Sequence, residues 1–333
     1  MDLFFSFIVP VYNRPNEIRE LLQSLAAQTY TKPYEIVIVE DGSTLSSEEE
    51  IEKFSQLPIT YLKKPNSGPG DSRNYGMQRA KGNYFIVLDS DCILPPEYLV
   101  TAEASLEESY VDCYGGPDAA HQSFSSVQKA INYAMTSLWT TGGIRGRKDA
   151  VGKFQPRSFN MGISKPAFQK TGGYGNIHPG EDPDLTIRLW NNGFETKLIP
   201  EAFVYHKRRI DWNKFYIQVN KFGMVRPILN KWHPSTAKIT YWFPALFCLG
   251  FLISVAAVFL GFPWFLYFYC LYFGLIFVDS LIKNKSVKIA FLSLVAVIIQ
   301  FVGYGYGFVK STFSLMFSSK KAEEIFPKLF FKI

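Results

Sequence analysis

The sequence has few of the features typical of secreted, disulfide-bonded domains or of domains that fold around a structural metal ion. It has four cysteines in 333 residues, Cys92, Cys113, Cys248 and Cys270, and their positions show neither paired spacing nor metal-ligand spacing. It has no internal repeat and no low-complexity segment, and its first residues, MDLFFSFIVP, lack the basic leader of a secretion signal. We therefore expect a reduced compartment, no structural disulfide, and a first strand in the cytosol.

Charge is nearly absent from the C-terminal third. Asp279 is the only charged residue from 239 to 282, and the stretch 289–309 has none. Because a helix that spans a bilayer needs roughly 20 apolar residues, the first stretch can supply two spans, broken at Gly261-Phe262-Pro263, and the second stretch a third. A pair of very apolar core helices is the alternative. We predict a membrane region of about three helices at 239–312, followed by a short basic tail at 313–333.

Positive charge is concentrated just before these stretches. The net charge is +6, and a single acid, Asp211, stands among the basic residues that follow His206. Those basic residues are Lys207, Arg208, Arg209, Lys214, Lys221, Arg226, Lys231 and Lys238. Such a cluster predicts the cytoplasmic face of a cell membrane, where each basic residue gains about 1 kcal/mol from anionic lipid. A third span would export Lys310, Lys320 and Lys321, so the last segment is either a span or a tilted, re-entrant or interfacial helix.

Before residue 239, short apolar runs alternate with helical periodicity. The runs predict strands at 5–9, 35–39, 60–62 and 84–88, and helices over 13–28, 46–56 and 70–80. Asn13 or Asn16 is the expected cap of the first helix. This alternation is typical of an α/β domain with a mostly parallel sheet, in which ligands bind beyond the carboxyl ends of the strands.

Carboxylates follow two of these strands. Asp41 comes after the second strand, and Asp89 and Asp91 come after the fourth. An Asx turn alone would explain an isolated pair of this kind. Two neighbouring carboxylates repel each other, however, and Mg²⁺ or Mn²⁺ prefers such oxygen ligands together with substrate phosphates. We predict that Asp89 and Asp91 hold Mg²⁺ or Mn²⁺ and that the metal binds a diphosphate.

Four segments resemble family 2 glycosyltransferases in order and approximate spacing. They are FIVPVYNRPNEIRELLQSLAAQT, EIVIVEDGST, GPGDSRNYGMQRAKGNYFIVLDSDC and GEDPDLTIRLWNNGF. The resemblance covers about 5–222 and implies a nucleotide-diphospho-sugar transferase (GT-A) fold with inverting chemistry. It also implies a cytoplasmic catalytic domain, which we place at 1–238, and a nucleotide-diphospho-sugar donor, most commonly a UDP-sugar.

The resemblance implies nucleotide-binding roles near the N-terminus. Pro10 and Tyr12 would border the nucleobase, and Asp41 would accept a hydrogen bond from it. Glu40 stands where many relatives have an aspartate. Arg73 would contact the base or the diphosphate, unless it is an exposed helix arginine.

The same resemblance implies a metal and diphosphate site. Asp91 would be the main metal ligand, and Asp89 would contact ribose or metal. His206 resembles a position that contacts metal or diphosphate, and Arg208 and Arg209 would assist the leaving group. The alternative for these last three is a juxtamembrane basic cluster that contacts lipid phosphate.

The pair Glu181-Asp182 resembles the family's catalytic segment. Asp182 would be the general base that deprotonates the acceptor, with Glu181 as the second candidate. A positioned carboxylate base contributes about 10²–10⁴ in rate. The structural alternative is an ordinary helix N-cap at Asp182 followed by Pro183, although a cap residue can also be a base.

One departure from the family concerns chain growth. Processive polysaccharide synthases have a Gln-x-x-Arg-Trp signature, whereas this chain has Gln218-Val219-Asn220-Lys221-Phe222. We expect one sugar per acceptor in cell-surface glycan synthesis, with a lipid-linked or polyprenyl-linked acceptor. A small processive synthase and a non-catalytic scaffold that binds nucleotide-sugar are the alternatives, and no nucleic acid is expected as a partner.

Overall fold

The computed structural model describes residues 2–119, 124–142, 153–206 and 211–331. The chain divides into two compact units. Unit 1 contains Met1–His121, Ile144–Lys207 and Phe330–Ile333, and unit 2 contains Gln122–Gly143 and Arg208–Leu329. Each unit has its own core.

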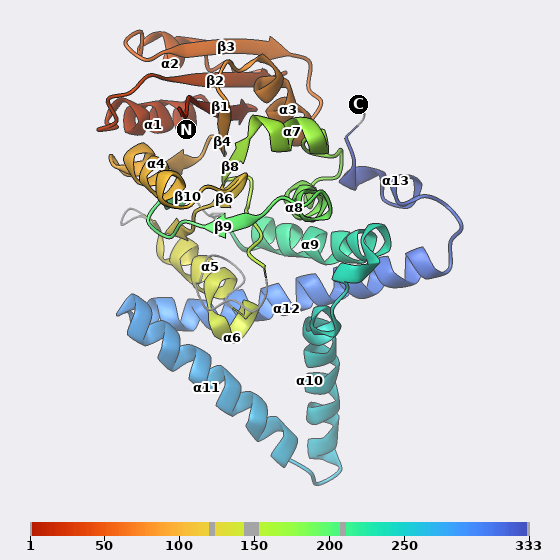
Figure 1. Ribbon diagram of the computed structural model, residues 1–333. Helices are drawn as coiled ribbons and strands as arrows, with labels where there is room; N and C mark the ends of the chain where they lie inside the picture. The colour runs from red at the N-terminus through yellow and green to blue at the C-terminus, as the bar shows by residue number, and fades with distance from the viewer. Residues whose placement is uncertain (1, 120–123, 143–152, 207–210, 332–333) are drawn as a thin grey trace. The chain divides into compact units, whose positions relative to one another are not determined.

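Unit 1 is built on a seven-stranded sheet with the order β3-β2-β1-β4-β8-β6-β9 (Figure 1). Its strands are β1 (Phe5–Val11), β2 (Tyr34–Asp41), β3 (Ile59–Lys64), β4 (Tyr84–Leu88), β6 (Cys113–Gly115), β8 (Asn160–Ser164) and β9 (Thr196–Leu198). The first four strands are parallel, while β8 runs antiparallel to both β4 and β6. A smaller sheet joins β5 (Cys92–Ile93), β10 (Val204–His206) and β7 (Asp118–Ala119). The mostly parallel α/β sheet predicted from the sequence is confirmed.

Helices cover both faces of the main sheet because alternate side chains of a strand point to opposite faces. Phe5, Phe7 and Val9 of β1 share a core with α1 (Pro15–Ala26) and α4 (Tyr98–Glu108). Ile8 points the other way, into a core with α3 (Pro69–Arg79), α7 (Lys165–Thr171) and α8 (Glu181–Asn191). The predicted helix at 46–56 is shorter in the structure, α2 (Glu48–Glu52).

The cap predicted for the first helix, Asn13 or Asn16, is wrong, and the alternative of an N-cap at Asp182 is not what the structure has. The N-cap of α1 is Arg14, whose side chain does not hydrogen-bond to the first turn of the helix. Asn13 instead accepts from the backbone N–H groups of Thr44 and Leu45, each at 2.8 Å. Helix α8 begins at Glu181, with Gly180 as its cap at φ 117°, so Asp182 lies inside the first turn. Glycine reaches this left-handed conformation without strain, and with Gly180 as the cap the helix starts two residues earlier than the aspartate-proline pattern predicts.

Unit 2 is helical. Its elements are α5 (Ser126–Thr136), α6 (Leu138–Thr141), α9 (Trp212–Trp232), η1 (Pro234–Thr236), η2 (Ile239–Trp242), α10 (Phe243–Phe259), α11 (Trp264–Asn284), α12 (Val287–Met316), α13 (Ala322–Ile325) and η3 (Pro327–Leu329). Three segments are long and apolar enough to cross a membrane: Ile239–Phe259, Trp264–Asn284 and Val287–Met316. The predicted break at 261–263 separates the first two. In Figure 1, α10 and α11 form a hairpin, while α12 lies along α9.

The third apolar helix differs from the other two in its contacts. A Cβ at Gly303 would clash with Val219 of α9, and one at Gly307 would clash with the backbone of Asn220. Glycines therefore allow α12 to approach α9 closely. Asp279, the one charge of the first apolar stretch, accepts a hydrogen bond from Tyr133 of α5 at 2.7 Å and pairs with Lys283 at 2.7 Å. Its role in this unit is structural.

Candidate active site

The candidate site lies at the carboxyl ends of the parallel strands. Tyr12 follows β1, Asp41 ends β2, and Asp89 and Asp91 follow β4. Side chains from distant segments meet these residues there. Arg14, two residues beyond Tyr12, donates from Nη1 to Asp91 Oδ2 at 2.7 Å. The predicted placement of these residues at one edge of the sheet follows from the parallel order of the strands.

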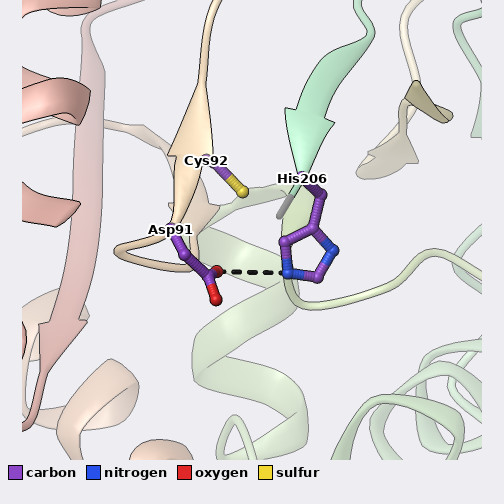
Figure 2. A group of neighbouring side chains, drawn as sticks. All are labelled: Asp91, Cys92 and His206. Atoms are coloured by element: carbon purple, nitrogen blue, oxygen red, sulfur yellow. Dashed lines mark ion pairs between the residues drawn. The ribbon is translucent and has the colours of Figure 1, made fainter. Parts of the chain in front are cut away.

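Asp91 and His206 form the centre of a group that could hold a metal ion. His206 Nε2 lies 3.1 Å from Asp91 Oδ1 and 3.8 Å from Asp89 Oδ2. Ligand atoms of Asp91, Cys92 and His206 lie within 4.8 Å of one another, and Figure 2 shows the carboxylate and the imidazole directed at each other. His206 ends β10 and Asp91 precedes β5, so the small sheet positions both residues by pairing these two strands.

The donor set fits Mg²⁺ or Mn²⁺. Carboxylate oxygen and imidazole nitrogen both bind Mn²⁺, and the carboxylate suits Mg²⁺. The Nδ1 atom of His206 is buried and has no hydrogen-bond partner in the described part of the chain, so Nε2 is the nitrogen that faces the carboxylates. Cys92 was not predicted here. Burial raises the pKa of its thiol well above the ordinary value, and its Sγ donates to the Phe159 carbonyl at 3.4 Å, so we assign it to packing.

Arg73 connects the two acidic motifs. Its Nη2 donates to Asp89 Oδ1 at 2.7 Å, and its Nη1 donates to Glu181 Oε1 at 3.1 Å. The side chain is only 3% exposed, so it is not the surface arginine of the alternative reading. Burial would lower the pKa of Arg73, but the charges of Asp89 and Glu181 outweigh it and raise that pKa further above its ordinary value. A permanent cation therefore holds the aspartates after β4 near the first turn of α8.

The adjacent carboxyls of α8 titrate in opposite directions. Burial raises the pKa of Glu181, but the charge and hydrogen bond of His178 and the charge of Arg73 outweigh it and lower the pKa to about 2. Burial also raises the pKa of Asp182, and the negative charge of Glu181 raises it further against the opposing effect of Arg157. Glu181 is thus a fixed anion, while the pKa of Asp182 is raised above its ordinary value, which makes the Asp182 carboxylate the better proton acceptor of the two.

Sequence reasoning missed several partners of these carboxylates. They are Arg14 at Asp91, Arg157 at 3.6 Å from Asp182, His178 at 3.0 Å from Glu181, and Lys64 at 2.7 Å from Asp41. Each pair except His178–Glu181 joins segments far apart in the chain, and no local pattern signals them. His178 stands three residues before Glu181, a spacing that by itself does not signal a contact between a loop histidine and a helix carboxylate.

The residues for which the sequence predicts nucleotide contacts include two closely hydrogen-bonded carboxylates at the end of β2. Asp41 is 3% exposed and accepts from Lys64, Asn66 and the backbone of Ser67 and Gly68. Glu40 accepts from Ser43, Ser47 and Tyr61, so both of its oxygens are engaged by its own surroundings. Tyr12 is 52% exposed and Pro10 half-buried. The roles of Pro10, Tyr12, Glu40 and Asp41 at a nucleotide stay predictions, and Arg208 and Arg209 lie outside the described residues.

Comparison with known proteins identifies the family. Residues 6–171 match the family described as Glycosyl transferase family 2. Glycosyltransferase GlyA of Streptococcus pneumoniae serotype 4 is 40% identical over 114 residues, which are 34% of this chain and 16% of that protein. The poly(ribitol-phosphate) beta-N-acetylglucosaminyltransferase TarS of Staphylococcus aureus is 38% identical over 112 residues, which are 32% of this chain and 20% of TarS. The chain thus matches about a fifth or less of the length of these relatives.

A solved structure extends the likeness along most of the chain. Mannosyltransferase PcManGT of Pyrobaculum calidifontis, in complex with GDP-Man and Mn²⁺, has a TM-score of 0.59 at 14% identity. The match covers 94% of this chain and 88% of that one, and it shows a shared fold. The N-terminal part of this chain is a family 2 glycosyltransferase domain of GT-A-like fold, followed by three long apolar helices.

Proposed function

We propose that this chain is a metal-dependent, inverting glycosyltransferase that moves a hexose-type sugar from a nucleotide-diphospho-sugar to a lipid-linked acceptor. The observation that carries this proposal is Arg73, which pairs with Asp89 on one side and Glu181 on the other. Arg73 thus links Asp89, which is expected near the donor diphosphate, to Glu181, which is next to the base expected at the acceptor hydroxyl. The two halves of the proposed site are therefore connected by one side chain.

Asp182 is the proposed general base. The acceptor oxygen attacks the anomeric carbon while the bond from that carbon to the diphosphate oxygen breaks, and the acceptor proton passes to the Asp182 carboxylate. The raised pKa of Asp182 makes it a better proton acceptor than an ordinary aspartate. Glu181 is held ionised by Arg73 and His178, so it orients these groups and keeps the Asp182 pKa raised. Attack from the face opposite the leaving group inverts the anomeric configuration.

The leaving diphosphate is proposed to lie at Asp91 and His206. Bound Mg²⁺ or Mn²⁺ at these two residues would neutralise charge that develops on the diphosphate, usually the largest catalytic contribution of such sites. Arg14, paired with Asp91 at 2.7 Å, places a further cation there. Asp89 is engaged by Arg73 at one oxygen, so we propose that it positions the ribose or the metal through the other. PcManGT, which was solved with GDP-Man and Mn²⁺, supports a donor and metal of this class.

The acceptor is proposed from the apolar helices. Three segments long enough to cross a membrane would keep the enzyme at a bilayer, where a polyprenyl-linked or other lipid-linked acceptor resides. The basic residues of α9, which include Lys214, Lys221, Arg226 and Lys231, support a cytoplasmic inner-membrane face with anionic lipid. We retain a catalytic domain at 1–238, a membrane region at 239–312 and a tail at 313–333 as the proposed organisation.

Release of nucleotide diphosphate by the purified, detergent-solubilised full chain tests this function. The donors are UDP-N-acetylglucosamine, UDP-glucose, UDP-galactose, GDP-mannose and dTDP-rhamnose, each with and without Mn²⁺ or Mg²⁺ and a polyprenyl-linked acceptor. Asp91→Ala is measured beside Glu49→Ala, which removes a carboxylate from the exposed surface of α2. We expect metal-dependent release from one donor that is lost in Asp91→Ala and retained in Glu49→Ala. Equal release from both variants, or none from wild type with any donor and acceptor, would refute the proposal.

Product analysis separates the finer alternatives. Proton NMR of the product reports the anomeric configuration, and retention of the donor configuration would refute the inverting mechanism. A ladder of products on a gel would indicate a processive synthase, whereas one band supports a single transfer.

A further inference from the structure

The backbone of Phe330–Phe331 is hydrogen-bonded to the loop that precedes α8. It follows the apolar helices in sequence but belongs to unit 1. Phe330 and Ile177 form an antiparallel β-bridge, and the Phe331 N–H donates to the Asn176 carbonyl at 3.0 Å. The loop 172–180 connects α7 to α8 and contains four glycines. Because glycine-rich loops have little intrinsic rigidity, these backbone contacts give the loop a fixed neighbour.

The ring of Phe331 contacts both sides of the proposed site. It lies so close to Gly68 that a Cβ at that glycine would collide with it. Its centroid is also 5.9 Å from the His178 ring, at an interplanar angle of 53°. Gly68 and His178 are 110 positions apart in sequence, and the phenylalanine ring packs against both.

Each of these neighbours hydrogen-bonds to a carboxylate of the site. The Gly68 N–H donates to Asp41 Oδ2 at 2.9 Å. His178 Nδ1 lies 3.0 Å from Glu181 Oε1. His178 is itself 40% exposed at its side chain, so packing against Phe331 restricts a ring that solvent would otherwise leave free to rotate. Phe331 thus packs against one residue that hydrogen-bonds to Asp41 and against another that contacts Glu181.

We propose that Phe331 is a positioning residue of the transfer reaction, which braces His178 against Glu181 and the Gly68 turn beside Asp41. This inference rests on the proposed function, because it assigns Glu181-Asp182 to the acceptor side. Groups that support catalytic residues hold them within roughly 0.5 Å of the productive geometry. A misplacement of about 1 Å costs on the order of 10²-fold in rate. Removal of the ring should therefore lower kcat while it leaves the apparent Tm close to that of the wild type.

The test compares Phe331→Ala with Phe331→Tyr in the full chain, with Phe317→Ala as control. Tyrosine keeps a ring of the same size at position 331, and Phe317 is 78% exposed at the end of α12. Three measurements are made in detergent: steady-state kinetics (kcat and KM) with each donor of the panel above plus Mn²⁺, hydrogen–deuterium exchange of peptides covering 176–182, and the apparent Tm. The exchange measurement does not depend on turnover.

We expect Phe331→Ala to lower kcat by about 10- to 100-fold and to speed exchange in 176–182, with the apparent Tm close to wild type. Phe331→Tyr should restore both, and Phe317→Ala should change neither. An unchanged kcat in Phe331→Ala, or unchanged exchange of 176–182, overturns the inference. A wild type without turnover for any donor refutes the proposed function instead, and the exchange result then decides separately whether Phe331 braces the loop.

Discussion

Replacement of Arg73 by methionine removes the cation that joins the two acidic motifs. Arg73 is 3% exposed and Glu181 is 4% exposed, so this pair is shielded from water. Removing one partner of a buried ion pair typically costs about 3–5 kcal/mol, because the other charge stays buried without compensation. His178 still contacts Glu181, and Asp89 is 31% exposed, which places the expected loss near the lower end, about 3 kcal/mol.

The loss is measurable as an apparent Tm. For a domain of 150–250 residues, 1 kcal/mol corresponds to roughly 2–4 °C, so Arg73→Met should unfold about 6–12 °C below wild type. Arg79→Met is the matched control, since Arg79 lies on the same helix, is exposed, and stacks on Tyr75. Differential scanning fluorimetry of the detergent-solubilised full chain gives both values.

A second substitution separates lost charge pairing from lost packing. Glu181→Gln in the Arg73→Met background removes the buried charge that has lost its arginine partner and keeps only the contact with His178. The double variant should therefore be more stable than Arg73→Met alone, although Glu181→Gln by itself destabilises. If Arg73→Met unfolds within 1–2 °C of Arg79→Met (roughly 0.5 kcal/mol), or if Glu181→Gln adds to its destabilisation, the reasoning about this pair is refuted.

Other expected outcomes concern activity. Asp182→Asn should lower kcat by about 10²–10⁴ with little change in donor KM, and single-turnover rates equal to wild type would contradict its role as base. Because the base must be deprotonated and its pKa is raised, kcat/KM should fall as pH falls through a pKa above the ordinary aspartate value of 3.8. In Glu181→Gln this acid limb should move to lower pH, and a pH profile with no shift would exclude the coupling. His206→Ala should raise the Mn²⁺ concentration for half-maximal activity, and an unchanged metal titration would remove His206 from the metal site. Tyr12→Ala should raise the donor KM roughly tenfold because it removes the ring that stacks on the base, whereas Tyr12→Phe should leave the KM unchanged. Equal KM values in the two variants would exclude stacking.

Local patterns predicted the first half of the main sheet. Strand β4 was predicted at its exact bounds, and β1, β2 and β3 within one or two residues at each end. Their apolar centres, such as 36–39 in β2 and the whole of β4, give a pattern dense enough to detect, although β2 and β3 both end in charged residues. Helix α1 was equally clear, since Ile18, Leu21, Leu22 and Leu25 recur at helical spacing and are all buried.

The second half of the sheet was not predicted. Strands β6 and β9 have three residues each, and β5 and β7 have two. Such lengths are too short for a period-two pattern to rise above chance. Strand β6 forms because β8 pairs with β4 and provides the next edge, and β9 then pairs with β6. Strands β5 and β7 instead pair with β10 in the smaller sheet. The local sequence does not encode these long-range pairings.

The candidate site, like the sheet, could be predicted from the sequence only in part. The carboxylates could be placed at the sheet edge because strand ends are readable from the sequence. Their cationic partners could not, since Arg14 and Asp91 are 77 positions apart and Arg73 and Glu181 are 108 apart. Only the folded chain determines which arginine neutralises which acid, and this also decides which carboxyl of Glu181-Asp182 has the raised pKa.

Asn13 joins the loops that follow β1 and β2. It adopts φ 54° beyond β1, and its side chain accepts three hydrogen bonds from Thr44 and Leu45 beyond β2. Its own N–H donates to Ser43 at 2.8 Å. Hydrogen bonds thus hold the loops beyond β1 and β2 together, so this edge of the domain, where we propose that the nucleoside binds, is preorganised. Little conformational entropy is left to lose there on association, so the free energy of nucleoside contacts can be expressed almost fully as affinity.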